Sequence, residues 1–446
     1  MDFQQEYKSK LRTPQEAVRV VKSGDWVDYG SFHSFPQLLD KALAERKEEL
    51  RGVKFRGNLI PFRVEVAECD PSREHFFYTT WHCSAYERKL VERGLCNFTP
   101  MLYRNLHAYY RNYLEVNVAM LCATPMDKHG YFNLSCTAGA VGAIIERADI
   151  IILEINENLP WVCGGKGEVI HITDVDYIVE GEHGPLAEVP TPVASPEDIA
   201  IAKHILPYII DGATLQFGIG GLPDVLGAMI ADSDLKDLGM HTELCSNAYL
   251  DLYKAGKLTN KRKTYHRGKG LYGVATGNQE LYDWIDHNPG LECSQLDVIN
   301  NPAIIARNDH LISINACVSV DLFGQIASES SGLRQISGTG GQLDYVSGAV
   351  LSRGGKSFVA MTSTHTDKSG VVHSTIRPFF TEGDIITAPR SQSHFIVTEY
   401  GAINLAGRNT WERAEMLISI AHPDFRDWLC DEAERMGIWR RSNKTK

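Results

Sequence analysis

Two stretches of the chain, one near its start and one near residue 195, show the same order of apolar and polar positions. In the first, residues 13–16 (Thr-Pro-Gln-Glu) combine a capping threonine, a proline at the first helical position and a glutamate that completes a capping box. Apolar residues at helical spacing follow, and residues 26–30 have the pattern of a strand. In the second, residues 195–198 (Ser-Pro-Glu-Asp) begin a helix over 199–210, and residues 214–218 form the strand. The pattern therefore predicts two similar halves.

The likeness continues beyond each strand. A short loop leads to a proline, Pro36 or Pro223, and then to an apolar helical stripe. Residues 188–194 between the halves are proline-rich and aperiodic, as linkers often are, so we expect domains at 1–190 and 191–446. Further apolar runs at 150–155, 358–362 and 394–398 alternate with helical patterns. This alternation predicts an α/β fold of two open, mostly parallel sheets covered by helices, although the repeat could also reflect the common order of elements in α/β proteins.

Composition narrows the class of protein. The chain has 446 residues, 43% of them hydrophobic, and no apolar run of membrane-spanning length, so we expect a soluble cytoplasmic enzyme. We also expect a homo-oligomer, which the composition by itself does not decide. Its 10 cysteines are scattered without a CxxC pair, which predicts reduced thiols and no metal site. The net charge of −11 argues against nucleic acid as a partner. An anionic ligand therefore needs a local pocket.

A glycine-rich loop follows the strand of the second half. It reads Gly218, Ile219, Gly220, Gly221, Leu222 and Pro223, whereas residues 31–35 of the first half contain no glycine. Glycines allow a ligand to approach backbone N–H groups, and a helix N-terminus favours negative charge, so the loop predicts an anion or oxyanion site. A dinucleotide fingerprint requires glycine at position 223 and fails at Pro223, while a plain tight turn remains the simpler alternative.

Glu243 lies in the next strand-like segment, residues 238–247. In open α/β sheets, ligands bind at the carboxyl ends of the strands, where this glutamate is expected. A carboxylate beside backbone donors can attack a thioester carbonyl while the donors stabilise the oxyanion. For most glutamates a solvated or helix-capping role is the better interpretation, but this position favours a nucleophile.

A second glycine turn, residues 337–345 with Gly340 and Gly341, leads into a predicted helix. Between the two glycine turns lies a β-rich stretch, residues 312–325, in which Asn315 interrupts an otherwise apolar run. A buried amide needs a hydrogen-bond partner, for which an acyl oxygen and a backbone group are the two candidates.

With these residues in hand, the chain resembles the acetyl-CoA hydrolase/transferase family over nearly its whole length. The likeness rests on residues 26–30 (WVDYG), 125–132 (PMDKHGYF), 218–223, 241–243 (HTE), 338–344, 399–405 (EYGAINL) and 421–426 (AHPDFR). The resemblance implies two domains of the coenzyme A (CoA) transferase topology and a glutamyl nucleophile at Glu243. It also implies transfer of CoA between a short-chain acyl-CoA and a carboxylate, such as butyryl-CoA and acetate, with 4-hydroxybutyrate as a second acyl group. No cofactor beyond CoA itself is implied.

The resemblance also assigns binding residues. Expected CoA contacts are Gly218, Ile219, Gly220, Gly221, Leu222, Val320, Gly341 and Lys368. Gly220, Gly221, Asn315 and Gly340 are expected at the oxyanion site. Lys368 suits a phosphate or pantetheine contact, although a surface lysine on a turn is the default interpretation. His33 is a candidate substrate contact with a structural role as its alternative, and residues 31–35 and 59–62, expected to face the acyl chain, depart from the butyrate type.

The predicted reaction passes through an acyl-glutamyl anhydride and a glutamyl-CoA thioester on Glu243. One alternative is an acyl-CoA hydrolase on the same scaffold, and another is a CoA-binding protein without turnover. A metal-dependent enzyme using His107, His129 or His171 is disfavoured, because these residues form no ligand-spaced cluster in the sequence.

Overall fold

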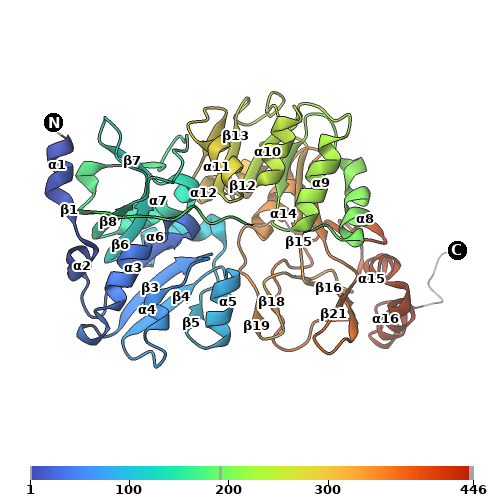
Figure 1. Ribbon diagram of the computed structural model, residues 1–446. Coiled ribbons are helices and arrows are strands. Elements are labelled where there is room, and N and C mark those ends of the chain that lie inside the picture. Colours follow the sequence, from blue (N-terminus) through green and yellow to red (C-terminus); the bar gives the residue numbers. More distant parts are fainter. Residues whose placement is uncertain (1–2, 190–192, 441–446) are drawn as a thin grey trace. The chain divides into compact units, whose positions relative to one another are not determined.

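The computed structural model describes residues 3–189 and 193–440, which form two compact units (Figure 1). Unit 1 contains the described residues up to 189 together with Glu243–Cys245 and Lys269–Asn300, and unit 2 contains the remainder. The predicted domain boundary between 190 and 191 lies outside the described residues.

The sheet of unit 1 has eight strands in the order β1-β10-β8-β6-β2-β3-β4-β5, and every neighbouring pair is parallel. Its strands are β1 (Leu11–Arg12), β2 (Trp26–Ser31), β3 (Val53–Asn58), β4 (Phe76–Thr80), β5 (Cys96–Phe98), β6 (Val118–Ala123), β8 (Ile150–Ile155) and β10 (Tyr177–Glu180). A separate antiparallel pair joins β7 (Tyr131–Asn133) to β9 (Val169–His171).

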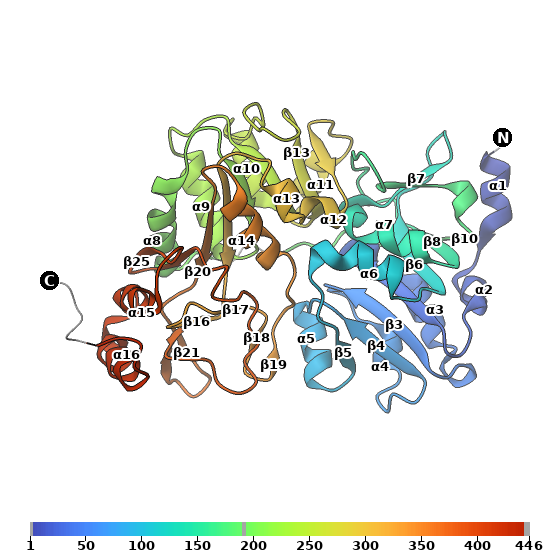
Figure 2. The same cartoon turned by 180° about the vertical axis from the view of Figure 1, so that it is seen from behind.

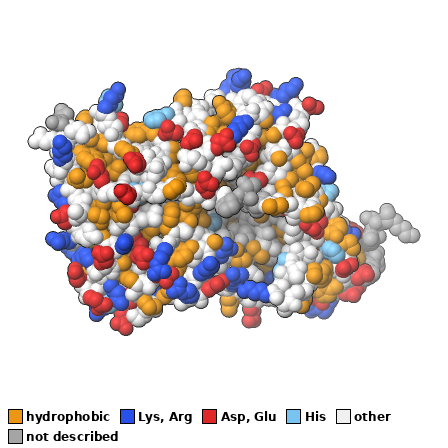
Figure 3. Space-filling view, in the orientation of Figure 1, with side chains coloured by type: hydrophobic (Ala, Val, Ile, Leu, Met, Phe, Trp, Pro, Cys, Tyr) orange, Lys and Arg blue, Asp and Glu red, His pale blue; other side chains and the backbone are white. Residues whose placement is uncertain are grey.

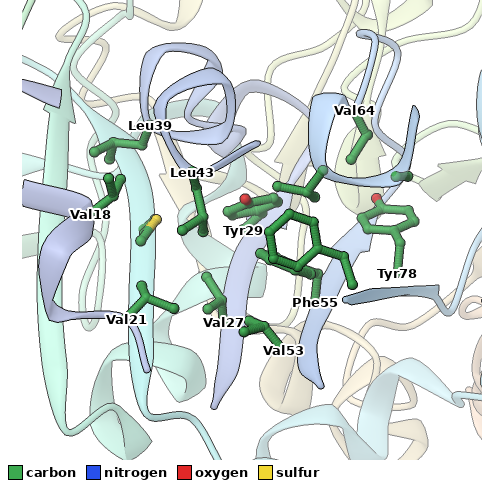
Figure 4. Packing of buried hydrophobic residues seen from close by; sticks show 14 of the residues in the cluster. Val18, Val21, Val27, Tyr29, Leu39, Leu43, Val53, Phe55, Val64 and Tyr78 are labelled. Atoms are coloured by element: carbon green, nitrogen blue, oxygen red, sulfur yellow. The ribbon is translucent and has the colours of Figure 1, made fainter. Parts of the chain in front are cut away.

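Helices cover both faces of this sheet. Figure 1 shows α3 (Gln37–Ala44) and α4 (Glu65–Glu68) on one face, and Figure 2 shows α6 (Leu106–Asn112) and α7 (Ala138–Arg147) on the other. The other helices of unit 1 are α1 (Phe3–Lys10), α2 (Pro14–Ala17), α5 (Ala85–Glu92), α11 (Gln279–Ile285) and α12 (Leu296–Ile299). On the α3 side, Leu39 and Leu43 pack with Tyr29 and Phe55 of the strands in a fully buried core (Figure 4). Coverage on both faces explains why the strands read as continuous apolar runs.

Unit 2 contributes six neighbouring strands in the order β12-β11-β15-β20-β24-β25. They are β12 (Gly239–Cys245), β11 (Thr214–Phe217), β15 (Leu311–Ala316), β20 (Lys356–Ala360), β24 (Phe395–Thr398) and β25 (Gly401–Asn404). The last pair is antiparallel, and the other four pairs of neighbouring strands are parallel. The chain passes into unit 1 within β12, after Thr242, and β13 (Gly270–Ala275) and β14 (Leu291–Cys293) of unit 1 pair in parallel.

Helices also cover both faces of the unit 2 strands (Figures 1 and 2). One face carries α8 (Pro196–Ile205), α9 (Gly221–Ala231) and α10 (Asn247–Lys254), and the other carries α13 (Pro302–Ile305) and α14 (Gln342–Leu351). A second core packs α14, α15 (Thr410–Ser419) and α16 (Pro423–Arg435) against the strands. None of the helices among residues 3–189 and 193–440 is long and apolar enough to cross a membrane.

The two units repeat one strand order, which confirms the prediction of two similar, mostly parallel halves. The series β3-β2-β6-β8-β10 of unit 1 matches β12-β11-β15-β20-β24 of unit 2, whereas the next strands differ, because β1 is parallel to β10 and β25 is antiparallel to β24. The registers match as well, because Val27 lies opposite Phe55 and Val118, as Leu215 lies opposite Met240 and Ile312. Continuing along these registers makes Asn58 the counterpart of Glu243, and Glu154 the counterpart of Ala360.

Both predicted capping boxes are present, at Thr13 and Ser195. The helix predicted over 199–210 instead ends at Ile205 and continues as a short 3-10 turn, Leu206–Tyr208. Pro207 supplies the reason, since its ring nitrogen cannot donate to the α-helical ladder.

Candidate active site

Glu243 lies near the carboxyl end of β12 and is half-buried. Its Oε2 accepts a hydrogen bond of 2.6 Å from Nδ2 of Asn300, a buried residue that directly follows α12. The backbone of Glu243 is closely packed against β13, where a Cβ added at Gly273 would lie 3.2 Å from the Glu243 carbonyl oxygen and 2.5 Å from Leu296. The Glu243 carboxylate is therefore fixed by the amide of Asn300, and the Glu243 backbone is held by its close contact with β13.

Sequence reasoning missed Asn300. A signal was available, because Asn300 and Asn301 precede Pro302 at the junction of two short helices, and a buried asparagine at such a place needs a partner.

Tyr103 links Glu243 to the first strand series. Burial raises the pKa of the Tyr103 phenol well above its usual value, and the negative charge of Glu243 raises it further. The Tyr103 hydroxyl accepts a hydrogen bond from Nδ2 of Asn58 at 3.1 Å, and the same Nδ2 donates to Oγ of Ser31 at 3.1 Å. The counterpart of Glu243 on β3 is thus the neutral amide of Asn58. This amide is hydrogen-bonded to Tyr103, whose pKa is raised by the charge of Glu243.

The glycine loop of unit 2 connects β11 to α9. Gly220 has φ +128°, a conformation that favours glycine, and Gly218 N donates to Ile314 O at 2.8 Å. Ile219 is 56% exposed, whereas Leu222 and Pro223 in the first turn of α9 are buried. Backbone groups of residues 218–221 and the Ile219 side chain are therefore accessible, while the Leu222 side chain packs inward.

Asn315 belongs to a buried amide network under this loop. Its Nδ2 donates to Gln216 Oε1 at 3.1 Å and to Ser313 Oγ at 3.0 Å, and Gln216 Nε2 donates back to Asn315 Oδ1 at 3.1 Å. A Cβ added at Gly218 would lie 3.1 Å from Asn315 Oδ1. The partner of Asn315 is thus a neighbouring side-chain amide, a possibility that differs from both candidates suggested by the sequence.

The second glycine turn lies in unit 2 beside the end of β15. Gly340 has φ +54°, Gly341 is the N-cap residue of α14, and Gln342 Nε2 donates to Ala316 O at 2.8 Å. Because Ala316 follows Asn315, the turn and the amide network lie close together. Val320 on β16 (Ser319–Asp321) is fully buried, and its N–H donates to Thr375 O at 3.1 Å.

Lys368 is exposed on the turn between β21 (Thr364–Thr366) and β22 (Val372–Ser374). Asp367 stiffens this turn by accepting from the backbone N–H groups of Ser369 and Val371. The hairpin borders a cavity of about 800 Å³ in unit 2. Residues lining the cavity include His365, His373, Arg377, Phe379, Phe425 and Trp428.

His33 lies in unit 1 after β2 and is buried. Its Nε2 lies 3.1 Å from Ala187 O, and its ring packs edge-on against Tyr282, which donates to the same carbonyl at 2.7 Å. Burial lowers the pKa of His33 to about 4, so the ring is neutral near pH 7. These contacts show a histidine that holds residue 187 in place.

One group among the described residues has the composition of a metal site, namely Cys122, Glu154 and His183, whose ligand atoms lie within 4.8 Å of one another. Glu154 Oε2 accepts from Leu38 N and Leu39 N at 3.0 Å each, and Oε1 lies 2.9 Å from His183 Nε2. These donors belong to the positive N-terminus of α3, which favours an anion and repels a cation. Burial, followed by the charge of Glu154, raises the pKa of the Cys122 thiol well above its usual value. The Glu154 carboxylate is therefore already bound by the N–H groups of a helix N-terminus and contacts His183, an arrangement that disfavours a metal ion.

On the face shown in Figure 3, acidic and basic side chains are interspersed over the described residues. This mixed surface leaves recognition of an anion to local sites such as the glycine loop.

Two family models match the chain. The acetyl-CoA hydrolase/transferase N-terminal domain matches residues 1–190, and the C-terminal domain of the same family matches residues 277–433. The chain belongs to the acetyl-CoA hydrolase/transferase family, as its motifs predict.

Full-length relatives narrow the class of enzyme. Butyryl-CoA:acetate CoA-transferase of Anaerostipes caccae is 49% identical over 446 residues, which is 100% of both chains. The 4-hydroxybutyrate coenzyme A transferase of Clostridium kluyveri is 36% identical and covers 98% of this chain and 100% of its own. The crystal structure of RipA from Yersinia pestis superposes with a TM-score of 0.89 at 35% identity, covering 98% of this chain and 100% of RipA. The chain is a CoA-transferase, and the predicted fold and enzyme class are confirmed.

Proposed function

We propose that the enzyme exchanges CoA between butyryl-CoA and acetate by a ping-pong reaction at Glu243. The observation that carries this proposal is the geometry of Glu243, a half-buried carboxylate held by Asn300 at the carboxyl end of a central strand. The substrates are those named for the Anaerostipes caccae relative.

The reaction begins when a Glu243 oxygen attacks the thioester carbon of butyryl-CoA. The carbon–sulfur bond breaks, CoA leaves as a thiolate, and a butyryl-glutamyl anhydride remains. The thiolate then attacks the glutamyl carbonyl carbon, so that butyrate leaves and CoA is bound to Glu243 as a thioester. Acetate attacks this thioester and reverses the two steps, which yields acetyl-CoA and free Glu243.

Several described features support the binding roles. The backbone of residues 218–221 is accessible at the N-terminus of α9, where N–H groups suit an oxyanion or a phosphate, and Gly220, Gly221 and Gly340 are the proposed donors. Asn315, held by Gln216, keeps this loop in shape. CoA contacts are proposed for Gly218, Ile219, Leu222, Val320, Gly341 and Lys368. The cavity beside the Lys368 hairpin offers aromatic and basic side chains for the nucleotide end of CoA.

Intact-mass analysis after incubation with butyryl-CoA tests the proposal. The wild-type enzyme should gain the mass of CoA less one water, and Glu243→Gln should not. Glu146→Gln is the matched control, because Glu146 is a half-exposed glutamate of unit 1 that pairs with Arg111. Absence of the adduct from the wild type, or its persistence in Glu243→Gln, would contradict the mechanism.

Omission of acetate separates transfer from hydrolysis. A transferase stalls once each active site carries CoA, whereas a hydrolase continues to consume butyryl-CoA. A panel of acceptor carboxylates then identifies the physiological acceptor.

A further inference from the structure

A short segment of unit 1, residues 59–64, joins β3 to α4 and is fastened at both ends by buried carboxyl groups. It starts one residue after Asn58, whose amide donates to the Tyr103 hydroxyl. The short turn that begins at Tyr103 packs against α12, and Asn300 directly after α12 donates to Glu243. The segment therefore begins close to the proposed nucleophile. We call it the β3–α4 segment.

The start of the β3–α4 segment is strained. Leu59 has φ +54°, a left-handed conformation that is uncommon for a residue with a side chain, and Phe32 at the end of the neighbouring strand has φ +43°. Such strain persists only where the surroundings determine the backbone, and it is frequent at ligand sites. Leu59 N donates to His82 O at 3.0 Å, which is one such restraint.

Glu87 holds the first end of the segment. Its Oε2 accepts from Ile60 N at 3.0 Å and from Ser84 N at 2.9 Å, and its Oε1 accepts from the Tyr78 hydroxyl at 2.8 Å. Ser84 Oγ donates in turn to Ile60 O at 2.5 Å. Glu87 is fully buried, so the backbone of Ile60 has no water to replace these bonds.

Asp40 holds the other end. Its Oδ2 accepts from Glu65 N at 2.6 Å, and its Oδ1 accepts from Val66 N at 3.4 Å. Asp40 is 1% exposed and lies on α3. Between the anchors, Val64 N donates to the Tyr86 hydroxyl at 3.2 Å.

The middle of the segment is apolar and accessible. Pro61 is exposed, and the half-buried Phe62 stacks on Phe35 with ring centroids 6.1 Å apart. An apolar surface anchored by polar groups behind it suits contact with the hydrocarbon part of an acyl group.

We infer that Glu87 and Asp40 are positioning residues that select the acyl group, because they fix both ends of the apolar β3–α4 segment near Glu243. This inference rests on the proposed function. Neither carboxyl group contacts substrate, and each acts through the backbone of the segment. Loss of either anchor should allow the segment to shift, which changes acyl-chain preference more than it changes the chemistry at Glu243.

The test compares Glu87→Gln and Asp40→Asn with Asp70→Asn in an acyl-CoA panel from acetyl to hexanoyl, with acetate as acceptor for the longer thioesters and butyrate for acetyl-CoA. Asp70 is a matched control, since it is a buried carboxyl that accepts from His75 N and Phe76 N at the opposite end of β4. We expect the ratio of kcat/KM for hexanoyl-CoA to that for butyryl-CoA to change about fivefold or more in the anchor variants, and less than about twofold in Asp70→Asn.

A further variant keeps the inference testable if Glu87→Gln or Asp40→Asn fails to fold. Tyr86→Phe removes the acceptor of Val64 N together with a hydrogen bond to Glu68 Oε1, and it should change the ratio in the same direction. An unchanged ratio in folded anchor variants that still form the covalent CoA adduct would overturn the inference. Failure of the wild type to form the adduct would instead refute the proposed function.

Discussion

Removal of the Glu154 side chain should expose how strongly the fold depends on one internal carboxylate. In unit 1, the buried Glu154 accepts from Leu38 N and Leu39 N and contacts His183 Nε2. Glu154→Ala leaves the two backbone donors without this acceptor, each at a cost of about 1–3 kcal/mol, so a loss of roughly 2–6 kcal/mol is expected in the free energy of unfolding. Because whole domains are stable by only about 5–15 kcal/mol, this is a large effect.

Glu154→Gln provides the matched comparison. The amide oxygen can still accept from the two backbone N–H groups, and only the contact with His183 changes, so a cost of about 1–2 kcal/mol is expected. Urea unfolding followed by circular dichroism measures both variants.

A second experiment measures the melting temperature of the Glu154→Ala variant in the presence of sodium formate. The vacated space faces the N-terminus of α3, which attracts anions, so formate should raise the melting temperature of this variant more than chloride does at equal ionic strength. The reasoning fails if Glu154→Ala costs less than about 1 kcal/mol, or if Glu154→Gln costs as much as Glu154→Ala.

Three further predictions follow from the described contacts. Asn300→Ala removes the 2.6 Å hydrogen bond to Glu243, the proposed nucleophile, and should lower kcat/KM for butyryl-CoA about 10- to 100-fold, measured at steady state, while Tm changes little. Gly218→Ala places a Cβ 3.1 Å from Asn315 Oδ1, so it should weaken CoA binding measured by calorimetry, and unchanged affinity would argue against the loop as the CoA site. Burial raises the pKa values of Asp40 and Glu87 to about 7, so their stabilising contribution is complete below the unfolded values near 4 and is lost as pH rises to about 7. Subtracting the unfolding free energies of Asp40→Asn and Glu87→Gln from those of the wild type should isolate this loss, on the order of 3–4 kcal/mol for each group, and a flat difference would contradict it.

The sequence predicted the architecture well because the architecture depends on short-range patterns. Capping residues at Thr13 and Ser195 and buried strand runs such as Ile150–Ile155 carry their own signals, and the repeated order of these signals revealed two similar halves. The predicted helix extends beyond its observed end at Ile205, because the apolar pattern continues through a 3-10 turn.

The candidate site was predictable only in part. Glu243, the glycine loop and Asn315 could be selected from local motifs and a family resemblance, and their roles stay predictions. Asn300, Gln216 and Tyr103 were missed because their importance depends on pairings far apart in the sequence, such as the 57 residues between Asn300 and Glu243. No local period or composition encodes such a pairing.

The matched strand registers place different side chains at equivalent positions of the two strand series. At the carboxyl ends of the unit 1 strands, Glu154 lies on β8 and the amide Asn58 lies on β3. In the other series, the equivalent positions hold Ala360 and Glu243. Under the proposed mechanism, loops of the unit 1 series can therefore change to accommodate other acyl groups without altering the strand that carries the nucleophile.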